Sequence, residues 1–122
     1  METQSLVERI VRSLDTHKAS EIKVLKVTEV TSLADYFVIA AGTSSTQVRA
    51  LADYAEFELS QQGVQPLRIE GYQTSQWILL DYASVVVHIF KEETRQFYDL
   101  EHLWNDGREV DFNSFLENGG QE

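Results

Sequence analysis

Apolar residues recur with helical spacing in two stretches of the chain. In residues 5–17 and again in residues 44–62 they fall every three or four positions, which predicts an amphipathic helix in each stretch. The apolar positions are Leu6, Val7, Ile10, Val11 and Leu14 in the first stretch and Val48, Leu51, Ala52, Ala55 and Leu59 in the second. Each predicted helix therefore has one face that can pack on a core.

Capping motifs mark the starts of both helices. Ser5 with Glu8 and Ser44 with Gln47 have the spacing of a capping box, in which a hydroxyl caps the first turn and an acid or amide side chain reaches back. Gly63 follows the second helix at the position where glycine commonly ends one. The second helix is therefore the best defined element of the sequence.

Shorter apolar patterns predict about five strands. Their residues are 22–28, 36–41, 66–69, 77–82 and 85–90. The first strand alternates between two faces, whereas the second is a continuous apolar run, typical of a strand covered on both sides. Only Ala83 and Ser84 separate the last two strands, so these should form an antiparallel hairpin.

A final helix over residues 93–104 completes the order α-β-β-α-β-β-β-α. This order predicts an α/β domain of the mixed α+β type, with an about five-stranded mixed sheet and helices packed on it. The crossover from strand 36–41 through the second helix to the third strand should be parallel and right-handed if both strands share the sheet. Residues 1–106 are predicted to be a single domain and residues 107–122 a flexible polar C-terminal tail.

Charge and cysteine content restrict the function. Twenty acidic and ten basic residues give a formal net charge of −10. This acidity argues against direct DNA binding and favours a basic protein partner, although colloidal solubility explains it equally well. The absence of cysteine excludes disulfides, thiolate zinc sites and a cysteine nucleophile. We expect no secretory signal and no membrane association, because no apolar stretch approaches the roughly 20 residues that span a bilayer.

Residues that could form a hydrolase site are present but lack the expected motif. Ser44 or Ser45, at a strand-to-helix turn, could act with His88 and Asp81. The turn lacks the second glycine of the G-x-S-x-G nucleophile elbow, however, and the helix cap already explains Ser44. His88 is predicted to be a structural histidine at one sheet face with one or two hydrogen bonds, because no histidine here has metal-ligand spacing.

The same turn could bind a phosphate. Gly42, Thr43 and Ser44 precede a helix, whose free backbone N–H groups attract anions. The turn is neither a Walker loop nor a G-x-G-x-x-G motif, and no strand carries the paired acids with which nucleotidyl transfer holds Mg²⁺. We therefore expect no enzyme activity, no cofactor and no metal, with a small nucleotidyltransferase-like or phosphate-binding enzyme as the alternative.

Aromatic and acidic residues gather in the last third of the chain. Trp77 shares a strand face with Asp81, while Tyr98, Asp99 and Glu101 lie off the apolar stripe of the last predicted helix. Core packing explains a tryptophan at the start of a strand, but a tryptophan beside a carboxylate is also typical of interface hot spots. The cluster therefore suggests a surface for a basic partner.

Three segments of the chain form a pattern in the right order and spacing. They read ADYFVIAAGTSSTQVRALAD, EGYQTSQWILLDYASVVVHIF and TRQFYDLEHLW. Together they resemble the ribosomal silencing factor family, also called Iojap or RsfS, from about Ile22 to Asp106. The specific elements are Asp35-Tyr36-Phe37-Val38-Ile39, Gly42 with Ser44-Ser45, Glu70-Gly71, Trp77 with Asp81, Val87-His88 and Tyr98-x-Leu100-Glu101-x-Leu103-Trp104.

The resemblance implies a fold and a function. The fold is a mixed five-stranded sheet with nucleotidyltransferase-like topology but without the catalytic acids. The function is binding to a large-subunit ribosomal protein, the fourteenth in the standard naming, which blocks joining of the two subunits and represses translation under nutrient limitation. The resemblance also implies a homodimer when free and a bacterial cytoplasm, with an organelle stroma or matrix as an open alternative. A structural dimer that scaffolds another basic protein is a third interpretation.

The residues predicted to bind the ribosomal partner follow from this resemblance and from the acidic aromatic cluster. They are Glu70, Trp77, Asp81, Tyr98, Asp99 and Glu101. Two positions depart from the usual family pattern: Lys26 stands where an aspartate is usual, and Ala83-Ser84 where Gly-Asp is usual. The second departure removes one acid near the expected contact surface.

Overall fold

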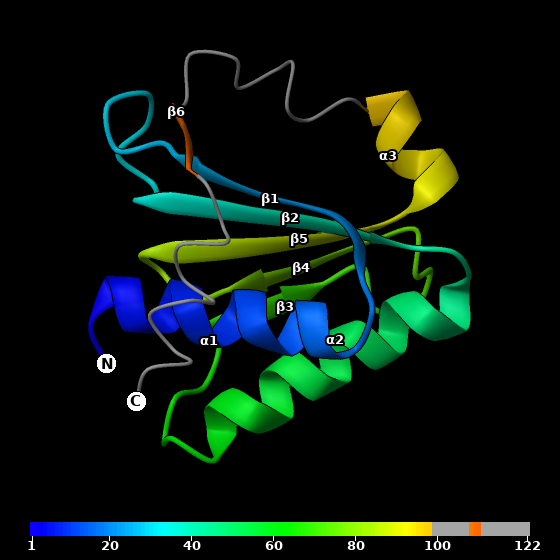
Figure 1. Cartoon of the computed structure of the whole chain (residues 1–122), viewed down its shortest axis with the longest axis horizontal. Helices are drawn as coiled ribbons and strands as arrows, with labels where there is room; N and C mark the ends of the chain where they lie inside the picture. The colour runs from blue at the N-terminus through cyan, green and yellow to red at the C-terminus, as the bar shows by residue number, and fades with distance from the viewer. Residues whose placement is uncertain (99–107, 111–122) are drawn as a thin grey trace.

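One mixed sheet organises the chain in a computed structural model that describes residues 1–98 and 108–110. Two helices lie along one face of the sheet, and a third lies beyond the opposite face, at one end (Figure 1). The elements are α1 (Thr3–Thr16), β1 (Ser20–Lys26), β2 (Tyr36–Gly42), α2 (Ser45–Ser60), β3 (Arg68–Glu70), β4 (Trp77–Asp81), β5 (Val85–Lys91), α3 (Glu92–Tyr98) and β6 (Arg108–Val110). The predicted order of helices and strands is confirmed through α3.

The strands follow the order β3-β4-β5-β2-β1-β6 across the sheet. β4 and β5 form the predicted antiparallel hairpin, whereas β2 and β5 pair in parallel at the centre. Because β3 is antiparallel to β4 and β4 is antiparallel to β5, β3 runs parallel to β2. The mixed five-stranded sheet and the parallel crossover through α2 are therefore confirmed.

A sixth strand lies inside the predicted tail. Residues Arg108–Val110 pair antiparallel with Val24–Lys26 of β1. A strand at the edge of a sheet presents unpaired N–H and C=O groups, which a passing segment can take up. The prediction of an unstructured tail is therefore wrong for these three residues, and the rest of the segment 107–122 lies outside the described residues.

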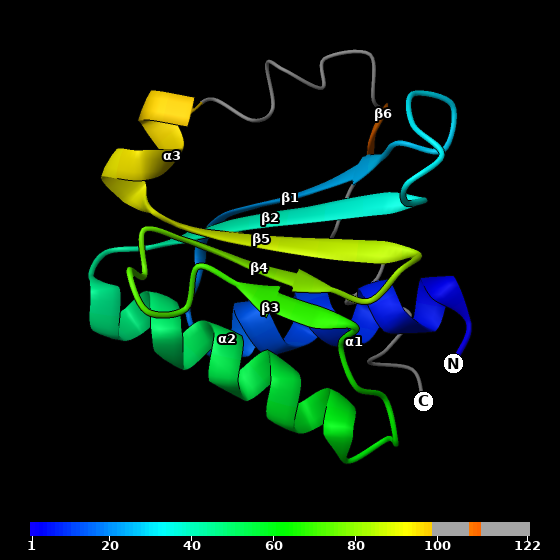
Figure 2. The same cartoon turned by 180° about the vertical axis from the view of Figure 1, so that it is seen from behind.

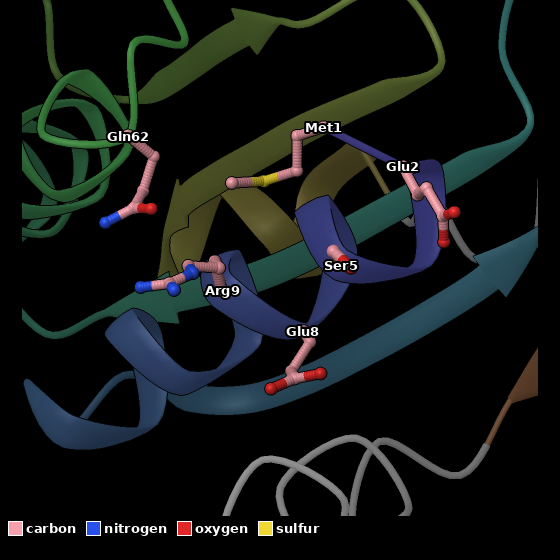
Figure 3. Close-up of a pocket in the computed structure, with 6 residues that line it drawn as sticks. All are labelled: Met1, Glu2, Ser5, Glu8, Arg9 and Gln62. Atoms are coloured by element: carbon pink, nitrogen blue, oxygen red, sulfur yellow. The ribbon is translucent and has the colours of Figure 1, made fainter. Parts of the chain in front are cut away.

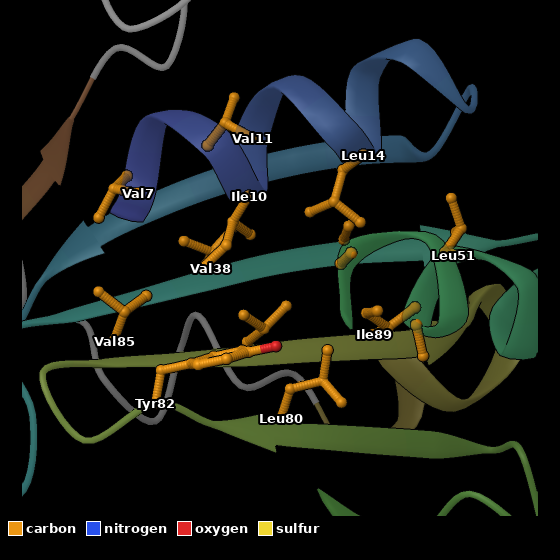
Figure 4. Close-up of a cluster of buried hydrophobic side chains, with 14 of the residues drawn as sticks. Val7, Ile10, Val11, Leu14, Val38, Leu51, Leu80, Tyr82, Val85 and Ile89 are labelled. Atoms are coloured by element: carbon orange, nitrogen blue, oxygen red, sulfur yellow. The ribbon is translucent and has the colours of Figure 1, made fainter. Parts of the chain in front are cut away.

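The main core lies between the sheet and the two long helices (Figure 4). Every apolar position predicted for α1 and α2 is buried there. The strands contribute the remaining core residues, among them Val38, Leu80, Val85 and Ile89. At about 25 cal/mol per Å² of apolar surface, such burial is the main stabilising contribution to the fold.

A second, smaller cluster occupies the other face of the sheet. Its buried members are Leu25, Val27, Ala34, Phe37, Ile39 and Phe90, with Trp77 and Val86 packed against them. β2 therefore contributes side chains to both clusters, as its continuous apolar run predicted. The second cluster therefore underlies the part of the surface on which Trp77 lies.

The two predicted capping boxes have different outcomes. Ser44 caps α2 as predicted, accepting a hydrogen bond from the N–H of Gln47 at 3.1 Å. The Gln47 side chain reaches back one residue further than expected and accepts from the N–H of Thr43 at 2.6 Å. The Ser5–Glu8 box is wrong because α1 already begins at Thr3 and has no side-chain cap.

Candidate functional site

Three of the predicted partner-binding residues share the sheet face opposite α1 and α2. Trp77 and Asp81 lie on that face of β4, because side chains alternate along a strand and the alternate residues Ile78 and Leu80 are buried in the main core. Glu70 of β3 pairs with Leu79 of β4, and cross-strand partners point to the same side. Figure 2 shows β3 and β4 side by side at one edge of the sheet.

Trp77 is held by two aromatic neighbours on β5. Its indole stacks on Phe90 with ring centroids 4.9 Å apart and planes inclined by 27°. Its Nε1–H donates a hydrogen bond to Nδ1 of His88 at 3.0 Å. The Trp77 side chain is only partly buried. It packs on the second cluster, as a core tryptophan would, and it keeps accessible surface, as an interface tryptophan would.

His88 is buried among aromatic side chains, with 5% of its surface exposed. Its ring meets the edge of Phe37, with centroids 4.9 Å apart. Desolvation by burial lowers the pKa of His88 to about 4, so the imidazole is neutral near pH 7. The prediction of a structural histidine with one or two hydrogen bonds is confirmed, since the ring accepts one bond, from Trp77.

Asp81 and Glu70 have different local environments. The carboxylate of Asp81 accepts from the N–H of Ala83 at 2.8 Å and from Nε of Arg68 at 3.1 Å, and 17% of the side chain is exposed. The Glu70 side chain is 56% exposed, with one oxygen 3.6 Å from Arg68. Glu70 is therefore free to approach a partner, whereas Asp81 also fixes the β4–β5 turn.

The loop before Trp77 is anchored to α2. Gly71 adopts φ +78°, and an added Cβ would stand 2.0 Å from the carbonyl oxygen of Trp77, so only glycine fits this close approach. Arg49 donates to the Ser75 hydroxyl at 2.6 Å. The Tyr72 hydroxyl donates to Asp53 at 3.1 Å. These bonds fix the backbone that leads into Trp77 and give the indole a defined starting direction.

α3 is anchored to two segments of the chain near the same end of the sheet. Thr94 of α3 donates to the Gln76 side chain at 2.8 Å, immediately before Trp77. Glu92 accepts from the Ser20 hydroxyl at 3.0 Å, and the buried Arg95 donates to the carbonyl oxygen of Glu21. The structure therefore brings α3 close to Trp77. This proximity is a condition for a single site formed by β4 and the last helix.

The predicted residues of the last helix are only partly described. Tyr98 is the final residue of α3. Asp99 and Glu101 lie outside the described residues, as does the remainder of the predicted helix to residue 104.

Trp77 and Asp81 lie at opposite ends of β4, because four strand residues span about 13 Å. The structure thus groups Trp77 with α3, and Asp81 with Arg68 at the other end of β4.

The alternative sites are not assembled. Ser44 caps α2, His88 accepts from Trp77, and Asp81 binds Arg68, so these three do not form a nucleophile, base and orienting acid. The turn considered for phosphate is filled by the chain itself, because Gln47 accepts from both the N–H and the hydroxyl of Thr43. An incoming anion would have to displace this side chain.

An open pocket of about 350 Å³ lies on the helical side of the molecule, between the start of α1 and the end of α2 (Figure 3). It is lined by Met1, Glu2, Ser5, Glu8, Arg9 and Gln62. Among residues 1–98 and 108–110, no group of three His, Cys, Asp or Glu side chains could hold a metal ion. No helix in the same part of the chain is long and apolar enough to cross a membrane.

Comparison with known proteins identifies the family. The sequence model described as "Ribosomal silencing factor during starvation" matches residues 1–122. The chain belongs to the ribosomal silencing factor family. A family member, "Ribosomal silencing factor RsfS" of Halalkalibacterium halodurans, is 34% identical over 116 residues, which are 95% of this chain and 99% of that protein.

A solved structure and an organellar relative extend the comparison. A crystal structure of a Chromobacterium violaceum protein superposes with a TM-score of 0.84 at 34% identity, covering 92% of each chain. An Arabidopsis thaliana relative named "Protein Iojap-related, mitochondrial" is 32% identical over 104 residues, which are 81% of this chain and 54% of that protein. The family resemblance and the α+β fold predicted from the sequence are thus confirmed, and the family has bacterial and organellar members.

Two features of the site were missed by the sequence reasoning. Strand alternation places Trp77 and His88 on one sheet face but gives no sign of the diagonal bond between them. Arg68 was not considered, although its pairing with Asp81 follows from the register of β3 on β4. Ala83 stands where the resemblance implies glycine, and it adopts φ +69°, a backbone conformation that favours glycine.

Proposed function

We propose that the chain represses translation under nutrient limitation by binding the large ribosomal subunit and blocking its joining to the small one. Family membership implies association with the large subunit. The contact is a basic ribosomal protein, the fourteenth of the large subunit, and the chain acts there by occupying a surface, without enzyme activity.

The partly exposed Trp77, presented by β4 beside α3, carries this proposal. Tryptophan that is rigidly held and partly accessible is typical of interface anchors. Glu70 adds an exposed carboxylate on the same sheet face. We also assign Asp81, Tyr98, Asp99 and Glu101 to the partner contact, since acidic side chains steer association with a basic protein.

The free protein is a homodimer, in the cytoplasm of a bacterium or in an organelle stroma or matrix. The net charge of −10 supports a basic protein partner over DNA. Light scattering of the purified protein tests the dimer: a monomeric mass across micromolar concentrations contradicts it.

Co-sedimentation with separated ribosomal subunits tests the function. We expect the protein to pellet with the large subunit and not with the small one. Trp77→Ala should weaken binding at least five-fold, since truncation of an anchor costs more than 1 kcal/mol. Phe57→Ala is the matched control, because Phe57 is an aromatic residue with 60% of its surface exposed on α2, on the other side of the sheet. Equal binding to both subunits, or unchanged binding of a folded Trp77→Ala variant, would contradict the proposal.

A further inference from the structure

The Trp77–His88 bond joins an interface residue to a buried acceptor. Trp77 pairs with Phe90 and Leu79 pairs with His88, so the bond from indole Nε1 to imidazole Nδ1 runs diagonally across the hairpin. Phe90 covers one ring face of the indole at the same time. The indole is therefore fixed both by stacking and by a directional bond.

The chemistry of this bond determines the tautomer of the histidine. An indole N–H can only donate, so Nδ1 of His88 must carry a lone pair, and the neutral ring then has its proton on Nε2. In the described part of the chain, Nε2 is buried and has no hydrogen-bond partner. His88 thus leaves one buried donor unpaired while it accepts from Trp77.

Packing alone does not account for a histidine at this position. An unpaired buried N–H is costly, and an apolar ring of similar size would fill the same space without that cost. The polar contact that offsets the cost is the bond to Trp77. Local departures from the rules of good packing are commonly found where a side chain serves function.

We propose that His88 is the positioning residue of the ribosome-binding surface, and that its Nδ1 holds the Trp77 indole in the orientation the partner recognises. This inference rests on the proposed role of Trp77 as an interface anchor. Binding sites depend on supporting side chains that lock the contacting residue in one rotamer. Without the acceptor, the indole samples other orientations, and ordering it again weakens binding.

Two amide substitutions separate positioning from packing. In His88→Asn the amide oxygen can stand close to the place of Nδ1, whereas in His88→Gln it lies further out, close to the place of Nε2. Both variants are polar and uncharged. We expect His88→Asn to keep the affinity for large subunits within about two-fold, and His88→Gln to lose about five-fold. His88→Phe keeps a ring, removes the acceptor, and should lose binding to the same extent as His88→Gln.

The NMR signal of the Trp77 indole N–H reports the bond itself. It is assigned by comparison with Trp77→Phe, and it should move in His88→Phe and His88→Gln but stay near its position in His88→Asn. Equal affinity of the Asn and Gln variants, or a displaced indole signal with wild-type affinity, overturns the inference. If Trp77→Ala itself binds normally, the proposed function fails instead, so the two failures are distinguishable.

Should His88→Phe fail to fold, the Asn and Gln variants decide the question. A thermal melt of each variant accompanies the binding assay. Loss of affinity in His88→Gln at a melting temperature equal to that of His88→Asn supports positioning. Loss of affinity that only parallels loss of stability across the three variants overturns it.

Discussion

Gly71→Ala should destabilise the protein far more than Gly63→Ala, although both glycines have nearly the same backbone conformation. Their φ angles are +78° and +77°, so an alanine at either position carries a penalty of about 1 kcal/mol for the left-handed region. At Gly63 nothing lies within 4 Å of an added Cβ. The Gly63 variant therefore measures the conformational penalty alone.

At Gly71 the added Cβ also meets backbone that cannot rotate away. It would lie 2.0 Å from the carbonyl oxygen of Trp77 and 3.1 Å from its carbonyl carbon. Moving the loop breaks the bond from the Ser75 N–H to the Gly71 oxygen and strains the bond from Arg49 to Ser75. At about 1 kcal/mol for each bond, the total cost is about 3 kcal/mol.

Urea denaturation followed by circular dichroism measures both variants, and thermal melts support it. Given roughly 4 °C per kcal/mol for a domain of this size, the melting temperature should fall by roughly 4 °C in Gly63→Ala and roughly 12 °C in Gly71→Ala. Free energies of unfolding within about 0.5 kcal/mol of each other would refute the reasoning, because the close approach to Trp77 would then carry no cost.

Two further predictions follow from Ala83 and His88. Ala83→Gly should raise the free energy of unfolding by about 1 kcal/mol, because φ at Ala83 is +69°; a lower melting temperature would contradict this. The pKa of His88 is about 4 in the folded protein against an ordinary value of 6.5, so the unfolded state binds an extra proton between these values and stability falls as pH drops from 6.5 to 4. The loss amounts to roughly 3 kcal/mol across the window. Urea titrations at pH 7, 6 and 5 should show this component in the wild type and not in His88→Phe; parallel curves for the two proteins would refute it.

The helices were predictable because their signals are local. The spacing of Val48, Leu51 and Leu59 alone specifies which face of α2 is buried, and no distant residue changes it. The Ser5–Glu8 box failed for a local reason as well: Glu8 forms an ion pair with Arg12 at 2.7 Å, one turn further along α1. The spacing of Ser5 and Glu8 matches a capping box, but the first turn of α1 has no side-chain cap.

The order of strands in the sheet depends on contacts between distant parts of the chain, which the spacing of apolar residues within one strand does not predict. Nothing in the run of β2 selects β5 as its neighbour, since any buried strand would satisfy its apolar faces. β6 was missed because three residues in a polar segment give no alternating pattern, and their pairing depends on the free edge of β1. In the site, alternation predicted that Trp77 and Asp81 share a face, but not that Arg68 and His88 would engage them.

The parallel pairing at the centre of the sheet has a consequence for how the chain folds. Tyr36 pairs with Val85 and Gly42 with Lys91, so α2, β3 and β4 all lie between partners that must meet before the central pair exists. Bringing β2 and β5 together restricts the long segment between them, and this loss of chain entropy comes before the stabilising contacts form. Folding should therefore be slower than that of a helical bundle of equal size. The β4–β5 hairpin, whose strands are joined by the three residues 82–84, is a part that can form early. β2 can also pair early with β1, since only residues 27–35 separate these antiparallel neighbours. We therefore expect the parallel contact between β2 and β5 to be among the last to form, and the edge of β2 that faces β5 to be exposed to aggregation until it does.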